Sequence, residues 1–124
     1  DQTDALAHKL EERGAAYIHV SSGGLTPAQK IAAGPGYQVP FAERLKRETK
    51  LPVIAVGLIT EARQAEEIVA SGKADLVALA RGVLYDPRWP WHAAAELGAQ
   101  AHAPNQYLRS QPPTLKALLK RYGT

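Results

Sequence analysis

Three short apolar runs interrupt the chain, and each is rich in β-branched residues. They cover residues 17–21 (YIHVS), 52–56 (PVIAV) and 75–80 (DLVALA). Continuous apolar runs, as opposed to strict alternation with polar residues, are typical of strands that are buried on both faces, as in parallel sheets. The pattern therefore predicts three buried parallel strands.

Amphipathic segments separate these strands and predict four helices. The segments cover residues 3–13, 40–50, 60–71 and 86–97. A glycine follows the first, third and fourth of them, Pro40 opens the second, and Thr60 and Asp86 are suitable N-caps. In the second helix, Phe41 and Leu45 are expected to form the apolar stripe.

The order of these elements is helix, strand, helix, strand, helix, strand, helix, followed by a tail. Alternating β/α units with right-handed crossovers predict an α/β fold with a parallel sheet. Three strands cannot close a barrel, because a (β/α)8 barrel takes about 250 residues and this chain has 124. The chain also contains no methionine and begins at Asp1. We therefore expect it to be a piece of a longer protein.

The tail differs from the β/α body in composition. Residues 99–113 contain three prolines and predict a loop, and residues 114–122 predict a short basic amphipathic helix. The apolar face of this helix would consist of Leu115, Leu118 and Leu119. The sequence thus predicts a body at residues 1–98 and a tail at residues 99–124, which could form a dimer contact.

Composition and charge argue against several classes of protein. The chain has no cysteine for a disulfide, thiol nucleophile or metal site, and its four histidines lack the spacing of metal ligands. No run approaches the roughly 20 apolar residues of a membrane span, and no signal-peptide pattern opens the chain. The net charge of +3 comes from residues 109–124, without a basic stripe interleaved with aromatic residues. We expect a cytoplasmic protein with no metal site and no membrane or nucleic-acid partner.

The loops that follow the three strands carry the candidate chemistry, because reactive groups of β/α proteins lie at the carboxyl ends of their strands. Gly57 and Arg81 open the loops after the second and third strands, and a helix follows each at once. Helix N-termini offer unpaired N–H donors and partial positive charge, and an arginine adds a planar cation that suits a phosphate dianion. These loops predict a phosphate site.

The same residues have a plainer interpretation, which stays open at this point. Gly57 and Gly82 could serve only tight turns, and Arg81 could be a solvated surface arginine. The patterns GxGxxG and GxxxxGK[ST] are absent, which argues against a Rossmann or P-loop cradle. The long loop at residues 23–39 could be a functional lid or a solvated insertion; its chemically capable groups are Lys30, Tyr37 and Gln38.

Several motifs in order resemble the C-terminal part of the Old Yellow Enzyme family, and within it the bacterial, thermophilic-like, NADPH-dependent ene-reductases. The motifs are HVSSGGLTP, GPGYQVPFAERLKRE, AVGLITEARQAEEIVASGKAD and DLVALARGVLYDPRWPWHAAAELG, and the likeness spans about residues 4–109. The resemblance implies a (β/α)8 TIM barrel in which the three strands are the sixth, seventh and eighth. On this basis the body is the C-terminal portion of that barrel, incomplete by itself.

The resemblance also implies a cofactor site. The phosphate of FMN would rest on backbone amides at Gly57 and at the pair Ala80-Arg81, where alanine replaces the glycine common in the family. Ser22 resembles a serine near the flavin. Arg109 resembles an arginine that reaches into the active site of the neighbouring subunit, which implies a homo-oligomer.

The activity implied by the resemblance is an FMN-dependent oxidoreductase that takes a hydride from NADPH and reduces activated C=C bonds of enones and similar small alkenes. The substrate-binding and proton-donating residues of the family belong to the first five β/α units. We therefore expect no catalytic residue in this segment, which would be inactive without the missing N-terminal portion. Two alternatives stay open: a structural or interaction fragment held by strand edges and the leucine face of the tail, and another phosphate-binding TIM-barrel enzyme, such as a sugar-phosphate isomerase or an aldolase.

Overall fold

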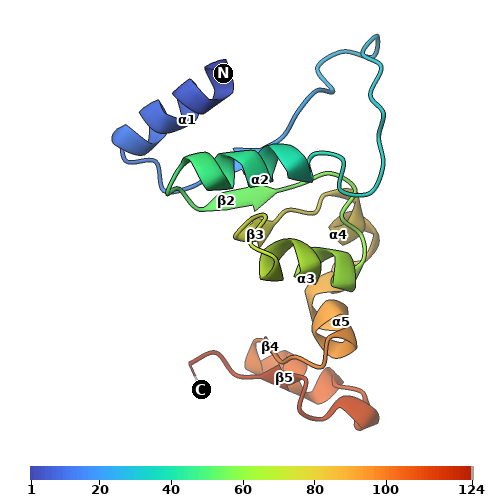
Figure 1. The fold of residues 1–124 in the computed structure, drawn as a ribbon. Helices are drawn as coiled ribbons and strands as arrows, with labels where there is room; N and C mark the ends of the chain where they lie inside the picture. The colour runs from blue at the N-terminus through green and yellow to red at the C-terminus, as the bar shows by residue number, and fades with distance from the viewer. Residues whose placement is uncertain (124) are drawn as a thin grey trace. The chain divides into compact units, whose positions relative to one another are not determined.

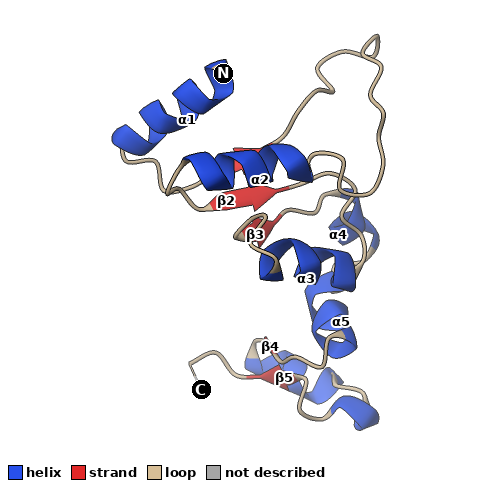
Figure 2. Cartoon of the chain, viewed as in Figure 1, coloured by secondary structure: helices blue, strands red, loops and turns tan. Residues whose placement is uncertain are grey.

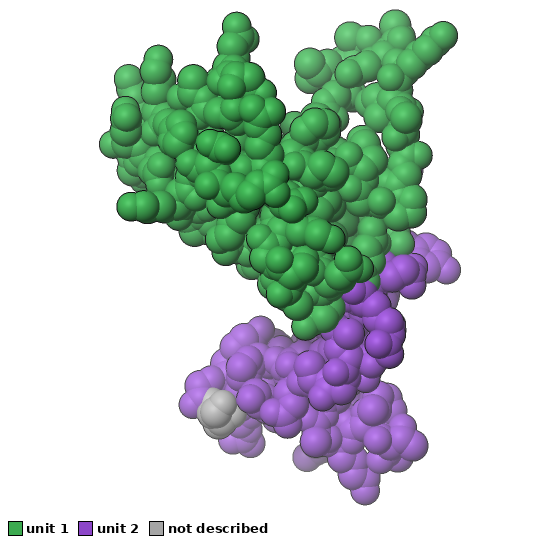
Figure 3. Space-filling view, viewed as in Figure 1, with its two compact units in different colours: residues 1–60, 64–80 green, residues 61–63, 81–124 purple. Residues whose placement is uncertain are grey.

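The computed structural model describes residues 1–123; Thr124, the end of the predicted tail, lies outside them. The chain divides into two compact units, which are coloured separately in Figure 3. Unit 1 holds residues 1–60 and 64–80, and unit 2 holds residues 61–63 and the chain from Arg81 onward. This division differs from the boundary predicted at residues 98 and 99, because the helices after the third strand group with the tail.

A three-stranded parallel sheet lies at the centre of unit 1, as the apolar runs predict (Figure 2). Its strands, in order across the sheet, are β1 (Ile18–Val20), β2 (Val53–Ala55) and β3 (Leu76–Val77). Ile18 pairs with Val53, and Ala55 pairs with Val20 on one side and Val77 on the other. Val53 and Ala55 are fully buried. These two residues point to the same face of the strand, and Ile54 on the opposite face is half-buried, so the central strand is fully buried on one face and partly buried on the other.

Three helices accompany the sheet: α1 (Gln2–Glu12), α2 (Val39–Glu48) and α3 (Ala62–Ala70). Asp1 caps α1, since its carboxylate accepts the backbone N–H groups of Thr3 (2.8 Å) and Asp4 (3.2 Å). Helix α2 begins one residue before Pro40, and it packs against the central strand (Figure 1). The predicted helices are thus present, with ends that move by one to two residues.

The buried face of α2 corrects the predicted stripe of Phe41 and Leu45. Val39, Ala42 and Leu45 are buried, whereas the Phe41 side chain is 50% exposed. The buried residues recur every three positions, and at about 100° per residue their middle, Ala42, lies about 100° away from Phe41 around the helix. Alanine and valine therefore form the contact with the sheet in place of the larger aromatic residue.

Asp75 fastens the start of β3 to that of β2. The backbone N–H of Asp75 donates to the Val53 carbonyl (2.9 Å), and the Asp75 carboxylate accepts the Val53 N–H (2.8 Å). The ammonium of Lys46 donates to its other oxygen (2.6 Å). These two side-chain hydrogen bonds, that of Lys46 first, lower the pKa of Asp75 below its ordinary value.

A lowered carboxyl pKa makes stability depend on pH in acid. The contribution of Asp75 is fully present above the unfolded pKa of about 4, and it is lost as the pH falls through the lower folded pKa. In urea unfolding followed by circular dichroism, we expect Asp75→Asn to lose up to about 1 kcal/mol above pH 5, since the site is partly exposed. The difference from wild type should vanish near pH 2. The control Glu66→Gln should show no such convergence, and a pH-independent difference for Asp75→Asn would contradict the prediction.

Unit 2 contains short helices, two short strands and two turns of 3-10 helix. Its elements are α4 (Arg81–Tyr85), α5 (Trp89–Glu96), β4 (Ala101–His102), η1 (Asn105–Ser110), η2 (Pro113–Leu115) and β5 (Leu119–Lys120). Helix α5 begins three residues later than predicted. Asp86 still supports that start, since its carboxylate accepts the Arg88 N–H (3.0 Å) and lies 2.6 Å from Nδ1 of His92. None of the helices in the described residues is long and apolar enough to span a bilayer.

The helix predicted at residues 114–122 is wrong. Leu119 and Lys120 form a strand that pairs in parallel with Ala101 and His102. Leu118 and Leu119 are both buried, packed with the fully buried Ala103. Leu119 is the first residue of β5, and Leu118 lies in the bend before it, where its N–H donates to the Leu115 carbonyl (3.0 Å). The leucine face required by the interaction-fragment alternative is therefore internal to unit 2.

Candidate functional site

The loops after the three parallel strands start at the same edge of the sheet, because parallel strands end on the same side. In unit 1 these loops carry Ser22 after β1, Gly57 after β2 and Ala80 after β3. Two of the predicted site residues, Ser22 and Gly57, both contact the side chain of Gln38, which lies at the end of the long loop that leads into α2. The structure thus brings Ser22 and Gly57 together through Gln38, whereas no hydrogen bond among the described residues joins Ala80 to them.

Gln38 is a buried polar residue, with 6% of its surface exposed. Its Oε1 accepts the backbone N–H of Ser22, and its Nε2 donates to the hydroxyl of Tyr37 (2.7 Å). Both ends of the amide group therefore have partners, as a buried polar group requires. Because the Ser22 amide is taken up by Gln38, the hydroxyl of Ser22 is the group it can offer to a ligand.

Gly57 lies directly on Gln38 in a conformation that favours glycine. Its φ is +116°, and a Cβ placed there would lie 3.1 Å from Cβ and from Cγ of Gln38 and 3.2 Å from its backbone nitrogen. The Gly57 carbonyl accepts the N–H of Gly36 (2.8 Å). The turn after β2 is therefore closed against the loop before α2, and it requires a residue without a side chain.

A second glutamine, Gln64 of α3, holds the rest of the turn after β2. Its Oε1 accepts the backbone N–H of Thr60 (3.1 Å), and its Nε2 donates to the carbonyl of Leu58 (3.2 Å). Leu58 has φ +50°, and it is the non-glycine residue with positive φ in the described part of the chain. Such left-handed positions are uncommon for leucine and need support from neighbouring contacts.

The strand ends offer backbone donors that suit an anion. Among the described residues, no acceptor faces the amide N–H groups of Gly57, Leu58 and Ala80. Ala80 is exposed, and Arg81, the next residue along the chain, is exposed as the first residue of α4. Unpaired amides at strand ends, with small residues around them, fit a phosphate ester such as that of FMN. No group of three or more potential metal-ligating residues occurs in the described chain.

Arg109 lies in unit 2, near the end of η1, with an exposed side chain. No ion pair or hydrogen bond holds its guanidinium among the described residues. The η1 segment itself is anchored: the rings of Tyr107 and Trp91 meet edge to face at 5.5 Å, and the guanidinium of Arg88 lies 5.3 Å and 5.4 Å from their centres. An anchored turn therefore presents a free cation.

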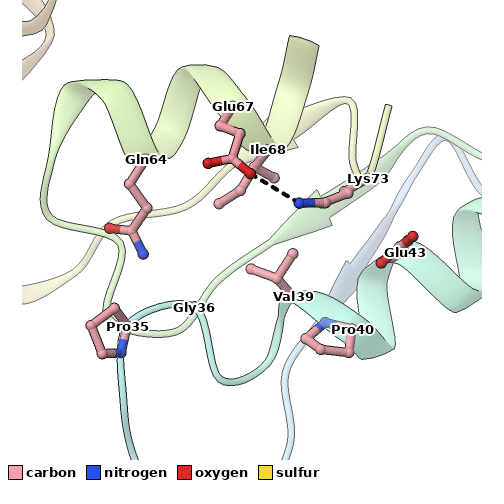
Figure 4. A pocket seen from close by; sticks show the side chains of 9 residues that line it. All are labelled: Pro35, Gly36, Val39, Pro40, Glu43, Gln64, Glu67, Ile68 and Lys73. Carbon is pink, nitrogen blue, oxygen red and sulfur yellow. Dashed lines mark hydrogen bonds and ion pairs between the residues drawn. The ribbon is translucent and has the colours of Figure 1, made fainter. Parts of the chain in front are cut away.

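A groove of about 260 Å³ on unit 1 lies apart from these residues. Figure 4 shows its lining residues, which include Val39 and Pro40 of α2 and Ile68 of α3, together with the ion pair of Glu67 and Lys73 (3.2 Å). None of the predicted site residues lines it. The charged side chains that line the groove have both signs and pair with neighbouring residues, so they indicate no particular ligand.

Sequence reasoning named Gln38 only as one capable group in a long loop, and it missed Gln64. Neither role follows a motif: Gln38 reaches a backbone group 16 residues away, and Gln64 reaches back over four and six residues to the turn before its helix. One signal was present: Gln38 directly precedes the helix that begins at Val39 and Pro40. A polar residue at such a start is placed to reach the end of a neighbouring strand. Lys30 is exposed in the loop.

Comparison with known proteins identifies the family. Residues 3–100 match the family described as NADH:flavin oxidoreductase / NADH oxidase. The chain is 52% identical over 101 residues to the NADPH dehydrogenase of Geobacillus thermodenitrificans and 53% identical over 103 residues to that of Geobacillus sp. strain WCH70. It is 46% identical over 105 residues to the NADPH dehydrogenase of Halalkalibacterium halodurans.

These alignments cover 82%, 83% and 85% of this chain, but only 29%, 30% and 31% of the three relatives. The chain therefore spans about a third of the length of the relatives it matches. The family agrees with the one that the motifs indicate, and it is a TIM-barrel family to which this chain contributes a short α/β piece. The chain belongs to the NADH:flavin oxidoreductase / NADH oxidase family.

Proposed function

We propose that this chain supplies the flavin-phosphate end of an FMN-dependent NADPH oxidoreductase that reduces activated C=C bonds. The observation that carries the proposal is the set of unpaired amides at Gly57, Leu58 and Ala80, which lies in a chain of a flavin family. Its relatives are named NADPH dehydrogenase. In this proposal β1, β2 and β3 are the sixth, seventh and eighth strands of a TIM barrel, and the whole enzyme acts in the cytoplasm.

The residues of this chain would bind and orient FMN. The amides of Gly57 and Ala80 would hold its phosphate, the guanidinium of Arg81 would balance the negative charge, and the Ser22 hydroxyl would lie near the flavin. Bound FMN would supply the redox chemistry, with NADPH as the hydride donor and a small alkene as the acceptor. The groups that bind and protonate the alkene would come from the part of the enzyme that this chain does not cover.

We also propose that the enzyme is a homo-oligomer in which Arg109 reaches the active site of a neighbouring subunit. The support is local: an exposed guanidinium without a partner among the described residues, on a turn anchored by Trp91 and Tyr107. A guanidinium held this way could bind an anionic or carbonyl oxygen of the substrate. This role would make the basic tail part of the active site.

A chimera tests the proposed function. This chain would replace the matching segment of the Geobacillus thermodenitrificans NADPH dehydrogenase, which is 52% identical to it. We expect the purified chimera to be yellow, with the visible absorbance of bound flavin, and to oxidise NADPH when an enone is added. A folded but colourless chimera, with the circular dichroism of the parent enzyme, would contradict the proposal.

Arg81→Ala in the same chimera separates phosphate binding from general folding. We expect FMN to bind about 10-fold to 100-fold more weakly, because a charge-assisted hydrogen bond contributes about 1.5–3 kcal/mol. Riboflavin, which lacks the phosphate, should bind as before. Arg13→Ala, which removes an exposed arginine at the end of α1, is the control and should change neither dissociation constant. Unchanged FMN binding in Arg81→Ala would remove this residue from the site.

A further inference from the structure

We propose that Gln38 is a positioning residue for the phosphate-binding amides, and this inference rests on the proposed function. Burying a glutamine removes its amide group from water, which is unfavourable unless hydrogen bonds within the protein replace those to water. Here Gln38 is 6% exposed and joins the turn after β1 to the turn after β2 through its contacts with Ser22 and Gly57, while its amide nitrogen donates to Tyr37. Those are the turns that carry Ser22 and Gly57.

The contact with Ser22 fixes the turn after β1. The backbone N–H of Ser22 donates to Oε1 of Gln38, and the hydroxyl of Tyr37 accepts from its Nε2 (2.7 Å). The Ser22 N–H can only donate, so the oxygen of the amide group must face it, and the Tyr37 hydroxyl accepts from the nitrogen at the other end. Gln38 thus links the Ser22 backbone to Tyr37.

The contact with Gly57 fixes the turn after β2. The Gly57 backbone rests on Cβ and Cγ of Gln38, close enough that a methyl group would lie 3.1 Å from each. The Gly57 carbonyl is held by the N–H of Gly36 (2.8 Å), two residues before Gln38. Because a trans peptide is planar, its N–H points opposite to its carbonyl, so this bond directs the Leu58 N–H away from the loop.

These contacts predict that Gln38 acts through the backbone of the two turns, and that the backbone amides bind the phosphate. Gln38 touches no ligand in this scheme. It holds the turn after β1 through the Ser22 N–H and supports the turn after β2, so that the amides of Gly57 and Leu58 are free and fixed before FMN binds. Donors fixed in advance bind an anion without paying to order a loop. Loss of Gln38 contacts should therefore weaken binding of the phosphate in particular, and leave recognition of the flavin ring intact.

The experiment compares FMN with riboflavin in the chimera described above. Gln38→Met keeps the length of the side chain and removes the acceptor for Ser22. We expect its FMN dissociation constant to rise on the order of 10-fold, as for a buried donor left unpaired, with the riboflavin constant unchanged. Gln38→Glu keeps an acceptor for the Ser22 N–H and adds a negative charge beside the amides that would bind the phosphate. It should also raise the dissociation constant of FMN and leave that of riboflavin unchanged.

The control is Gln29→Met, which removes a comparable bond, from the Gly24 N–H to Oε1 of Gln29 (2.8 Å), in the exposed part of the loop. It should alter neither dissociation constant. If both Gln38 variants lose affinity for FMN and for riboflavin equally, Gln38 has a general packing role and the inference is overturned. Unchanged affinity for both ligands would overturn it as well. If Gln38→Met does not fold, as judged by its melting curve, Gln38→Glu decides. Failure of the unmodified chimera to bind FMN would refute the proposed function itself.

Discussion

Gly57→Ala is expected to abolish FMN binding by the chimera and to destabilise unit 1. The added methyl group meets two obstacles at once. A φ of +116° is strained for an L-residue, and the group would lie 3.1–3.2 Å from atoms of the buried Gln38, including its backbone nitrogen. Strain and overpacking each cost about 1–3 kcal/mol, so we expect a loss of about 2–6 kcal/mol in the free energy of unfolding of the 124-residue chain.

Gly72→Ala is the matched control for this prediction. Gly72 also has a positive φ, +75°, but nothing lies within 4 Å of the position that a Cβ would take. It should therefore lose about 1 kcal/mol from conformation alone and leave FMN binding unchanged. Urea unfolding measures the stabilities, and flavin absorbance after gel filtration measures the binding. Equal losses in the two variants would show that the contact with Gln38 contributes nothing.

Leu118→Asp is expected to unfold the β4–β5 pair. Leu118 is 8% exposed and packs with Ala103 and Leu119, and its carbonyl accepts the N–H of Ala101 (2.8 Å). The substitution removes a buried leucine, which costs about 2–5 kcal/mol, and places a carboxylate in an apolar cluster. A loss of this size is comparable with the whole stability of a small unit.

Leu84→Asp is the control for Leu118→Asp. Leu84 also belongs to unit 2, but its side chain is 82% exposed, so the same change should lower the free energy of unfolding by less than about 0.5 kcal/mol. In the chimera, Leu118→Asp should keep its FMN and lose turnover, because the turn that carries Arg109 would lose its support. Loss of the flavin in Leu118→Asp would contradict this prediction, because it would show that FMN binding depends on the β4–β5 pair.

The elements of unit 1 could be predicted from the sequence because their signals are local. Each strand has its own apolar run, and α1 and α2 each have a cap or a proline at the start. The parallel sheet was predicted from continuous apolar runs such as Val53–Ala55, in which the two outer residues are buried and the middle one, on the opposite face, is half-buried. Local signals did not fix the face of α2, since the preference for Ala42 over Phe41 depends on the distance between helix and sheet.

The errors in the tail and at the site have a common physical cause. A strand pair such as Ala101 with Leu119 gains its energy from partners far apart in the chain, whereas the leucine spacing at residues 115–119 favours a helix locally. Gln38 likewise contacts Ser22, which lies 16 residues before it, and Gly57, which lies well after it in the chain. The glycine and the alanine-arginine pair were recognisable because family motifs include them; the glutamine that organises them was not.

Both tryptophans of the chain, Trp89 and Trp91, lie in α5 of unit 2. Trp91 contacts the ring of Tyr107 and the guanidinium of Arg88. Intrinsic fluorescence excited at the indole band therefore reports on unit 2 alone, whereas unit 1 is silent at that wavelength. A folding experiment that records emission beside far-ultraviolet ellipticity can thus tell whether the halves of the polypeptide melt together or in succession.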